Sequence, residues 1–128
     1  MVVGQKSPHS LTPLELRIMQ ALWRIGPANV RGVRQALRSN LAYTSVQTVL
    51  NILERKGKVK RTLRGRAYQY RAAVSQKKIC VAMVNDLVDR VFAGSTDQLI
   101  LTLIDTHPEC RSRIRELMGQ VADSMRDG

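Results

Sequence analysis

The sequence predicts a mainly α-helical fold with one small β-hairpin: three short helices, the hairpin, and then a further helical region. Two observations support this. Apolar side chains recur at helical spacing in separate segments that open with helix-capping residues. Between residues 58 and 71 the pattern changes to that of two short strands joined by a turn. We therefore divide the 128 residues into a disordered arm (1–10), an N-terminal domain (11–74) and a C-terminal helical region (75–128).

The first helix is predicted to begin at a capping box. Thr12 can cap the helix, Pro13 suits its first position, and Glu15 completes a Thr-x-x-Glu pattern. The apolar residues that then recur at helical spacing are Leu14, Ile18, Met19, Leu22 and Ile25. Gly26-Pro27 ends this helix.

A short second helix is expected after Asn29, and a third from Thr44 to Arg55. Thr44 and Gln47 have the spacing of another capping box. Gly57 can adopt the left-handed backbone conformation that ends a helix. At 100° per residue, the residues on the side predicted to be buried are Val46, Val49, Leu50 and Leu53. The residues on the opposite, polar side are Gln47, Thr48, Asn51 and Arg55. A helix that keeps one polar face exposed suits the major groove of DNA.

Residues 58–71 are predicted to form an antiparallel hairpin. Pairing the strands around Arg64-Gly65 places Val59 opposite Tyr70 and Arg61 opposite Tyr68 on one face. We expect both tyrosines to cover the edge of the core. Because the first position of a two-residue turn prefers Asn, Asp or Gly, we expect a longer, mobile tip. Three helices followed by such a hairpin is the order of a winged helix-turn-helix.

The positive charge is concentrated in the N-terminal part of the chain. Residues 1–74 contain 14 Lys and Arg but two acids, Glu15 and Glu54, whereas residues 75–128 contain 7 Lys and Arg and 8 acids. This asymmetry indicates a polyanionic partner, and double-stranded DNA fits both the third helix and the hairpin. A solvated basic face is the plain alternative. A basic membrane-surface helix is disfavoured, because the cations gather in the hairpin.

The polar and basic residues divide by predicted role. The residues predicted to read base edges are Gln47, Thr48, Asn51 and Arg55. Of these, Asn51 or Gln47 suits adenine, and Arg55 suits guanine or a phosphate. The residues predicted to contact phosphates are Arg31, Arg34, Thr44, Ser45, Lys58, Lys60, Arg61, Arg64 and Arg66. Phosphate contacts make binding salt-dependent, whereas base contacts supply sequence preference.

The C-terminal region predicts three more helices. One follows Ser75, Ser95 caps the next, and the last starts at His107-Pro108-Glu109. Periodicity alone also allows residues 99–104 to be a buried strand, but the cap favours a helix. So small a region cannot bury its apolar surface alone, so we expect a homodimer; folding back onto the N-terminal domain is the alternative. The predicted dimer contacts are Ile79, Met83, Leu87, Val91, Leu99, Ile100, Leu103, Ile114, Leu117, Met118 and Val121.

The sequence holds no catalytic or metal-binding pattern. It has no CxxC or HxxxH, and no P-loop, nucleophile elbow or dinucleotide fingerprint, so we expect neither enzyme activity nor a cofactor. Cys80 and Cys110 lie in different helices and are expected to be buried or half-buried thiols in a reducing compartment. The lack of a long apolar run or a signal-like start predicts a cytoplasmic protein with no membrane span.

Five segments taken together resemble the penicillinase-repressor (BlaI/MecI/CopY) family. They are LTPLELRIMQALW, ANVRGVRQAL, AYTSVQTVLNILERKGKVKR, GRAYQYRAAVS and FAGSTDQLILTLI. The resemblance extends from residue 11 to about residue 120. It implies a homodimeric winged-helix repressor that holds a palindromic operator and dimerises through its C-terminal helices. In it, residues 44–55 match the recognition helix and residues 58–71 match the wing.

Two branches of that family differ from this chain. Copper-responsive members carry a C-terminal cluster of closely spaced cysteines, whereas this chain has two separate ones. β-Lactamase-type members are inactivated when a membrane sensor protease cuts an Asn–Phe bond in an apolar C-terminal helix. The matching positions here are Thr102 and Leu103. The resemblance therefore adds a sensor protease as a candidate partner, while the inducer and the regulated gene stay open.

Two other functions fit parts of the pattern. A sequence-independent nucleic-acid-binding protein, chromatin-like or RNA-binding, needs the basic hairpin but no polar reading face. A partner-binding adaptor would use the C-terminal helices and leave the basic face incidental. Preference for one DNA sequence separates a repressor from both.

Overall fold

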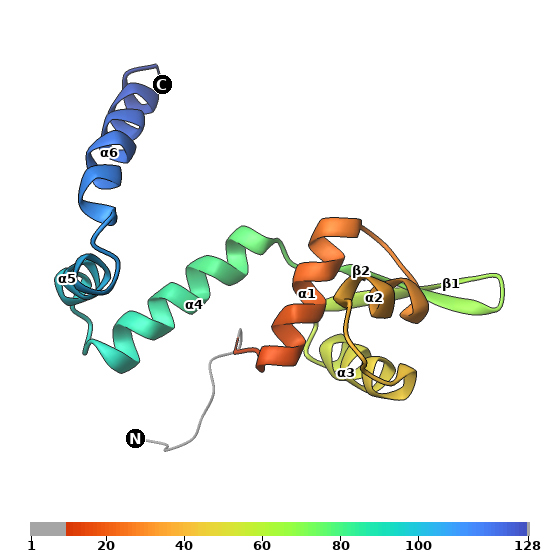
Figure 1. The fold of residues 1–128 in the computed structure, drawn as a ribbon. Helices are drawn as coiled ribbons and strands as arrows, with labels where there is room; N and C mark the ends of the chain where they lie inside the picture. Colours follow the sequence, from red (N-terminus) through yellow and green to blue (C-terminus); the bar gives the residue numbers. More distant parts are fainter. Residues whose placement is uncertain (1–9, 128) are drawn as a thin grey trace. The chain divides into compact units, whose positions relative to one another are not determined.

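The structure is a computed structural model that describes the backbone of residues 10–127 and the side chains of residues 10–125. Except for Ser10, the predicted disordered arm lies outside the described residues. The elements in chain order are α1 (Pro13–Ile25), α2 (Val30–Leu37), α3 (Tyr43–Arg55), β1 (Val59–Arg64), β2 (Ala67–Ala72), α4 (Gln76–Val91), α5 (Thr96–Thr106) and α6 (Cys110–Asp127) (Figure 1). The predicted class, mainly α with a small hairpin, is confirmed.

The chain forms two compact units, and the division falls within α4, between Met83 and Val84. This is later than the boundary expected at residue 74. The first turns of α4 belong to the N-terminal unit, where Ile79 is buried.

Local capping fixes the starts of α1 and α2. The cap of α1 is as predicted, and α2 begins after Asn29 as expected. Glu15 N donates to Thr12 Oγ1 at 3.1 Å and Thr12 N donates to Glu15 Oε1 at 2.7 Å, which completes the capping box. Asn29 Oδ1 accepts from Gly32 N at 2.8 Å and caps α2. The apolar stripe of α1 is buried at Ile18, Met19 and Leu22 and half-buried at Leu14, whereas Ile25 is 43% exposed at the last helical position, beyond the core.

The third helix starts earlier than predicted. Its N-cap is Ala42, so Thr44 is already helical and the predicted Thr44–Gln47 capping box is wrong. The Thr44 carbonyl instead accepts from Thr48 Oγ1 at 2.8 Å. The predicted end is confirmed: Gly57 has φ 77°, and Lys58 N donates to Leu53 O at 2.9 Å, as in a Schellman motif.

The hairpin register differs from the prediction by two residues. Arg61 pairs with Tyr70 and Leu63 with Tyr68, so the loop consists of Gly65 and Arg66 alone. Gly65, with φ 64°, stands at the first loop position, where a tight hairpin turn favours glycine, so the expected longer tip is not needed. Because the shift is an even number of residues, the side chains keep the predicted faces.

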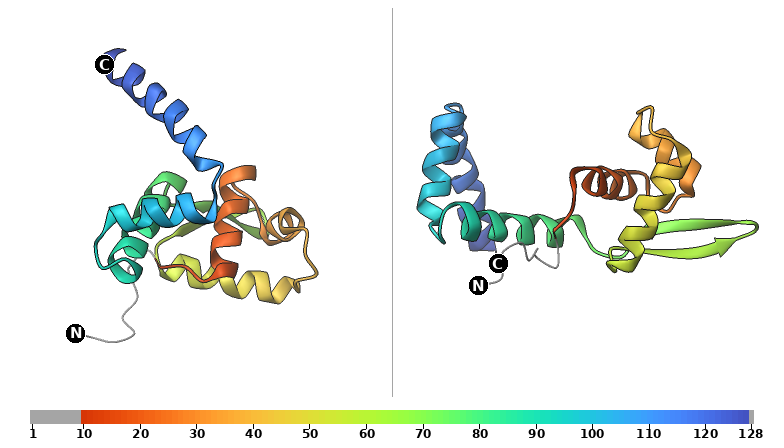
Figure 2. Two further views of the ribbon diagram at one scale, coloured as in Figure 1. Left: turned by 60° about the vertical axis from the view of Figure 1, so that its left-hand side comes forward. Right: turned by 90° about the horizontal axis from the view of Figure 1, so that it is seen from below.

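An isolated β-bridge joins the hairpin to the segment between α1 and α2. Ala28 N donates to Tyr70 O at 2.9 Å, and Tyr70 N donates to Ala28 O at 2.7 Å. The ring of Tyr70 is fully buried, which confirms its predicted structural role. Tyr68 is 41% exposed and does not pack on the core, so the same prediction is wrong for Tyr68. Beyond this anchor, β1 and β2 project past the three helices as a ribbon (Figures 1 and 2).

The core of the N-terminal unit lies between the three helices and the base of the hairpin. Its buried members are Ile18, Met19, Leu22, Val30, Val33, Val46, Leu50, Leu53, Val59 and Tyr70. Trp23 packs at its edge and donates from Nε1 to Val74 O at 2.9 Å, which ties the chain after β2 to α1. This packing fixes which face of α3 remains outside.

The C-terminal unit contains the rest of α4 with α5 and α6. Ser95 Oγ accepts from Gln98 N at 3.2 Å, and residues 99–104 are helical, which confirms the helix over the strand. The last helix begins at Cys110, a little after the predicted start. No residue of α5, all of which are described, is buried. Within the described part of the chain, no helix is long and apolar enough to cross a bilayer.

Candidate nucleic-acid interface

The outer face of α3 carries the predicted base-reading residues. Thr48 and Arg55 are exposed, as are Thr44 and Ser45 in the first turn, whereas Gln47 is half-buried. Core packing of Val46, Leu50 and Leu53 holds this helix by its opposite face. The polar face is therefore presented outward on a rigid element.

Asn51 is more constrained than the sequence suggests. It is half-buried, and its Oδ1 accepts from the hydroxyl of Tyr70 at 3.4 Å. This long hydrogen bond leaves the Nδ2 amino group as the donor that points away from Tyr70. An amino donor suits acceptors on a base edge, such as N7 of a purine.

The cations predicted to contact phosphates separate into three groups. Four are exposed, and no hydrogen bond or ion pair holds their side chains within the described part of the chain: Arg31, Lys60, Arg64 and Arg66. Two more are exposed but held: Arg34 Nε donates to Leu41 O at 2.7 Å, and Arg61 Nε lies 2.9 Å from Glu54 Oε2. Lys58 forms the third group on its own.

Lys58 does not lie on the surface, so its prediction as a phosphate contact is wrong. Lys58 is 4% exposed. It follows the Schellman turn of α3, and the Lys58 carbonyl accepts a hydrogen bond from Ala73 N at 2.8 Å. Burial, and then the nearby Lys78 and Lys56 charges, lower the pKa of the Lys58 ammonium. The alternating polar and apolar pattern of the strand does not reveal that distant parts of the chain bury this residue.

Arg61 braces the hairpin against α3. Its guanidinium pairs with Glu54 near the end of α3 and also lies 4.3 Å above the ring of Tyr68. Arg61 therefore links both hairpin strands to the helix. It remains an exposed cation, but its orientation is fixed by partners within the chain.

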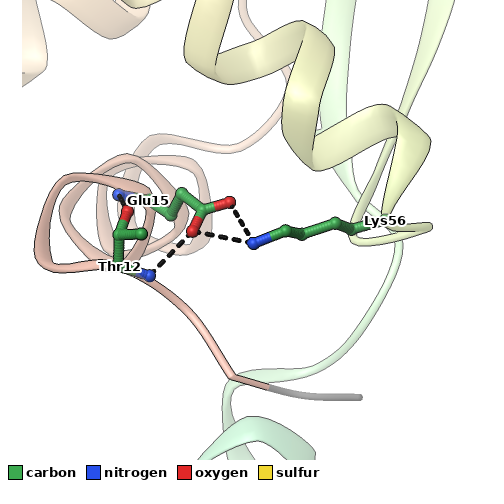
Figure 3. A network of polar contacts seen from close by, with 3 residues as sticks. All are labelled: Thr12, Glu15 and Lys56. Carbon is green, nitrogen blue, oxygen red and sulfur yellow. Dashed lines mark hydrogen bonds and ion pairs between the residues drawn. The ribbon is translucent and has the colours of Figure 1, made fainter. Parts of the chain in front are cut away.

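A second ion pair joins the start of α1 to the end of α3 (Figure 3). Lys56 Nζ lies 2.9 Å from Glu15 Oε1 and 2.7 Å from Glu15 Oε2. Glu15 is 3% exposed and also accepts from Thr12 N. Sequence reasoning placed Glu15 in the capping box but missed Lys56, because the partners are far apart along the chain.

A hollow of about 290 Å³ opens between α2, α3 and the hairpin. Its polar and aromatic lining residues are Asn29, Arg31, Tyr43, Gln47, Arg66 and Tyr68, with Tyr70 beneath them. No acid is among the described residues that line it. The hollow brings together a predicted base reader and two predicted phosphate contacts, which the sequence placed on separate elements.

The predicted dimer contacts in the described C-terminal part are largely exposed. The large apolar side chains that face outward there include Leu87, Val91, Ile100, Leu103, Ile114, Leu117, Met118 and Val121, and Met83 is exposed at the end of the N-terminal unit. Leu99 is half-buried. Ile79 is 1% exposed, so its prediction as a dimer contact is wrong: it packs within its own chain.

The predicted cleavage positions and both cysteines lie in the C-terminal helices. Thr102 and Leu103 are exposed within α5. Cys80 is exposed and Cys110 half-buried, so the expectation of a sheltered thiol fails at Cys80. Among the residues that the structure describes, no cluster of His, Cys, Asp or Glu could hold a metal ion.

Comparison with known proteins identifies the family. A family model described as Penicillinase repressor matches residues 11–122. The chain belongs to the penicillinase-repressor family. A curated relative, the transcriptional regulator BlaI of Mycobacterium tuberculosis, is 33% identical over 99 residues, which cover 74% of this chain and 72% of the relative. The penicillinase-repressor chain is thus a transcriptional regulator and not an enzyme.

Solved structures agree with the winged-helix fold of this chain. The solution structure of the DNA-binding domain of the repressor BlaI matches with a TM-score of 0.50 and 24% identity, over 56% of this chain and 90% of that one. The crystal structure of a transcriptional regulator from Thermotoga maritima matches with a TM-score of 0.51 and 20% identity, over 90% of this chain and 76% of that one. At these identities the likeness concerns the fold.

Proposed function

We propose that this penicillinase-repressor chain is a cytoplasmic homodimer that represses transcription by occupying a palindromic operator. The observation that supports this best is the division of α3 into a buried apolar face and an outward polar face beside a basic hairpin. Two such helices on a two-fold dimer would enter successive major grooves, with half-sites about one helical turn apart or a multiple of it.

The base-reading role belongs, in this proposal, to Gln47, Thr48, Asn51 and Arg55. Lys60, Arg64 and Arg66 of the hairpin and Arg31 of α2 hold phosphates, together with Thr44 and Ser45 at the start of α3. These positions are exposed or half-buried on the described surface of one unit, which supports the assignment. Arg34 and Arg61 would add charge from fixed orientations.

Dimerisation through the C-terminal helices is supported by their exposed apolar side chains. Leu117, Met118 and Val121 are exposed on α6, and Ile100 and Leu103 on α5. Apolar surface of this extent on so small a unit favours a partner that covers it, and a second copy is the simplest one.

Release of the operator by proteolysis between Thr102 and Leu103 is the finer part of the proposal. Both residues are exposed, but the bond lies within α5, where Thr102 Oγ1 donates to Gln98 O at 2.8 Å. A protease binds extended chain, so α5 would have to open locally first. In a single chain no residue of this fully described helix is buried, so there opening costs little packing energy. In the proposed dimer, opening would also break the contacts of Ile100 and Leu103.

Selection of bound DNA from a random pool tests the function. We expect an enriched palindrome that is also found in the promoter region upstream of the protein's own gene, bound at least a thousandfold more tightly than random DNA at physiological salt. Equal affinity for all sequences would instead favour a sequence-independent nucleic-acid-binding protein. A non-palindromic winner would contradict the two-fold dimer.

A further inference from the structure

We propose that the hollow between α2, α3 and the hairpin seats one phosphodiester group of the operator backbone, gripped jointly by Arg31 and Arg66. The inference rests on the proposed function and makes it more specific. In place of two separate phosphate contacts, both arginines form one phosphate site. Tyr43 and Tyr68 line that site.

The charge of the lining favours an anion. Arg31 and Arg66 come from α2 and from the hairpin loop, and the planar guanidinium of each offers several N–H donors that suit phosphate oxygens. Among the described residues, neither has an ion-pair or hydrogen-bond partner, in contrast to Arg34 and Arg61. Two unpaired guanidinium groups around one hollow repel each other until an anion lies between them.

The polar character of the lining favours a phosphate over an apolar ligand. Asn29 and Gln47 contribute amides, and Tyr43 and Tyr68 contribute hydroxyl groups that can donate to phosphate oxygens. At about 290 Å³, the space lies at the lower end of the range for small-molecule pockets, which are mostly apolar. It is sufficient for a phosphodiester and part of its sugar.

The walls of the hollow are held in place from outside. The ring of Tyr68 lies under Arg61, which in turn pairs with Glu54 on α3. Tyr70 forms the floor, where its backbone bridges to Ala28 and its hydroxyl donates to Asn51. A site whose walls are fixed before binding loses little conformational entropy when the ligand enters.

The position of the hollow also sets the register of α3 on DNA. Tyr43 and Gln47 are four residues apart and line the same opening, so a phosphate seated there lies beside Gln47. The base read by Gln47 should therefore be close to the nucleotide whose phosphate occupies the hollow. Phosphate contact and base readout become parts of one docking geometry.

A methylphosphonate scan of the selected operator tests the shared site. Each backbone position is made neutral in turn, and affinity is measured for the full-length protein and for Arg31→Gln, Arg66→Gln and the double variant. We expect one position per half-site at which wild-type protein loses about 10- to 100-fold in affinity. Both single variants should lose their sensitivity to the methylphosphonate at that same position. The affinity of the double variant should lie within about twofold of the affinity of each single variant.

Arg64→Gln is the matched control, because Arg64 is an exposed arginine at the end of β1 that does not line the hollow. It should lower affinity but keep the sensitivity at the shared position. Thermal unfolding of all variants should match wild type, since the three arginines are exposed.

Arginines that respond to two different phosphates, or losses that add in the double variant, would overturn the shared site. Titration of the DNA-free protein with inorganic phosphate separates a free anion from the DNA backbone. Saturable phosphate binding together with independent responses in the scan would assign the hollow to a free anion and reject the proposal. If the wild-type protein prefers no sequence, the repressor function fails. The affinities of the two single variants and the double variant for a random duplex then decide whether the two losses add, as they would for separate phosphates.

Discussion

Lys56, at the C-terminal end of α3, closes an ion pair 2.7 Å long onto Glu15, which lies at the start of α1 and is 3% exposed (Figure 3). The same carboxylate accepts from Thr12 N and thereby caps α1. A single side chain thus fixes the first turn of one helix and the last turn of another. For a helix proposed to read DNA, this contact defines its angle on the N-terminal unit.

Lys56→Met should destabilise the protein by about 1–3 kcal/mol in urea unfolding. Removing one partner of a buried pair leaves the other charge unpaired, although 36% exposure of the lysine side chain softens the loss. Glu116→Gln is the control: it breaks the exposed Arg113–Glu116 pair on α6 and should change stability by less than about 0.5 kcal/mol. Equal effects of both variants would show that burial of Glu15 is unimportant.

Stability should fall in acid through Glu15. Burial alone raises the pKa of this carboxyl, but hydrogen bonds from Lys56 and Thr12 outweigh it and hold the pKa below its ordinary value. Because the folded pKa is lowered, the stabilisation is complete above the unfolded pKa and is lost as pH falls through the folded pKa. Urea unfolding from about pH 7 to pH 3 should therefore show a steeper decline for wild type than for Glu15→Gln. Parallel curves would contradict the role of this carboxylate.

Tyr70→Phe should change sequence preference at one base position. The variant removes the hydroxyl that donates to Asn51 and keeps the buried ring, so the cost in stability should be about 0.5–1.5 kcal/mol. If Tyr70 orients the Asn51 amide, Tyr70→Phe and Asn51→Ala should relax preference at the same position in a competition assay. Relaxation at different positions would mean that Asn51 is oriented by something else.

Lys58 and Lys60 are near neighbours, but only Lys60 is expected to contribute to DNA binding. Lys60→Met should weaken binding to all sequences and reduce the slope of log affinity against log salt by about one. Lys58→Met should leave that slope unchanged, because Lys58 is 4% exposed and cannot reach a phosphate without unfolding its surroundings. A reduced slope for Lys58→Met would place this lysine on the DNA after all.

Leu117→Glu should shift the protein to monomers. A charge in the apolar face of α6 would have to be buried without a partner on dimerisation, whereas the exposed position tolerates it in a single chain. Sedimentation equilibrium should show a dimer for wild type and a monomer for the variant, with unchanged circular dichroism. Arg115→Glu on the same helix offers a charge-reversed control outside the predicted contact set.

The sequence predicted best what is decided locally. The capping box at Thr12, the start of α2 after Asn29 and the stop at Gly57 depend on a few neighbouring residues and are confirmed. The equally local capping box at Thr44 is wrong, because α3 begins one residue earlier. The hairpin register failed because Gly65 can be the first or the second residue of the loop, and only the pairing decides. The family resemblance, which rests on several separated segments, is also confirmed.

The contacts that shape the candidate site are nonlocal, and the sequence could not supply them. Burial of Lys58 depends on the chain beyond β2, and the Glu15–Lys56 pair joins the two ends of the three-helix segment. Arg31 and Arg66 line the same hollow only after the hairpin has docked through Ala28 and Tyr70. Faces of single helices were therefore predictable, whereas partners across elements were not.

Both carboxylates within residues 1–74 are neutralised inside the fold, Glu15 by Lys56 and Glu54 by Arg61. The N-terminal unit consequently has no unmatched negative side chain to offer a second copy of itself, and two such units repel each other in solution. In the proposed dimer, the C-terminal units, which carry 8 acids and 5 arginines in residues 84–128, must hold the copies together until the DNA phosphates screen that repulsion. The operator phosphates would then act as counterions that allow the two basic N-terminal units to bind next to each other.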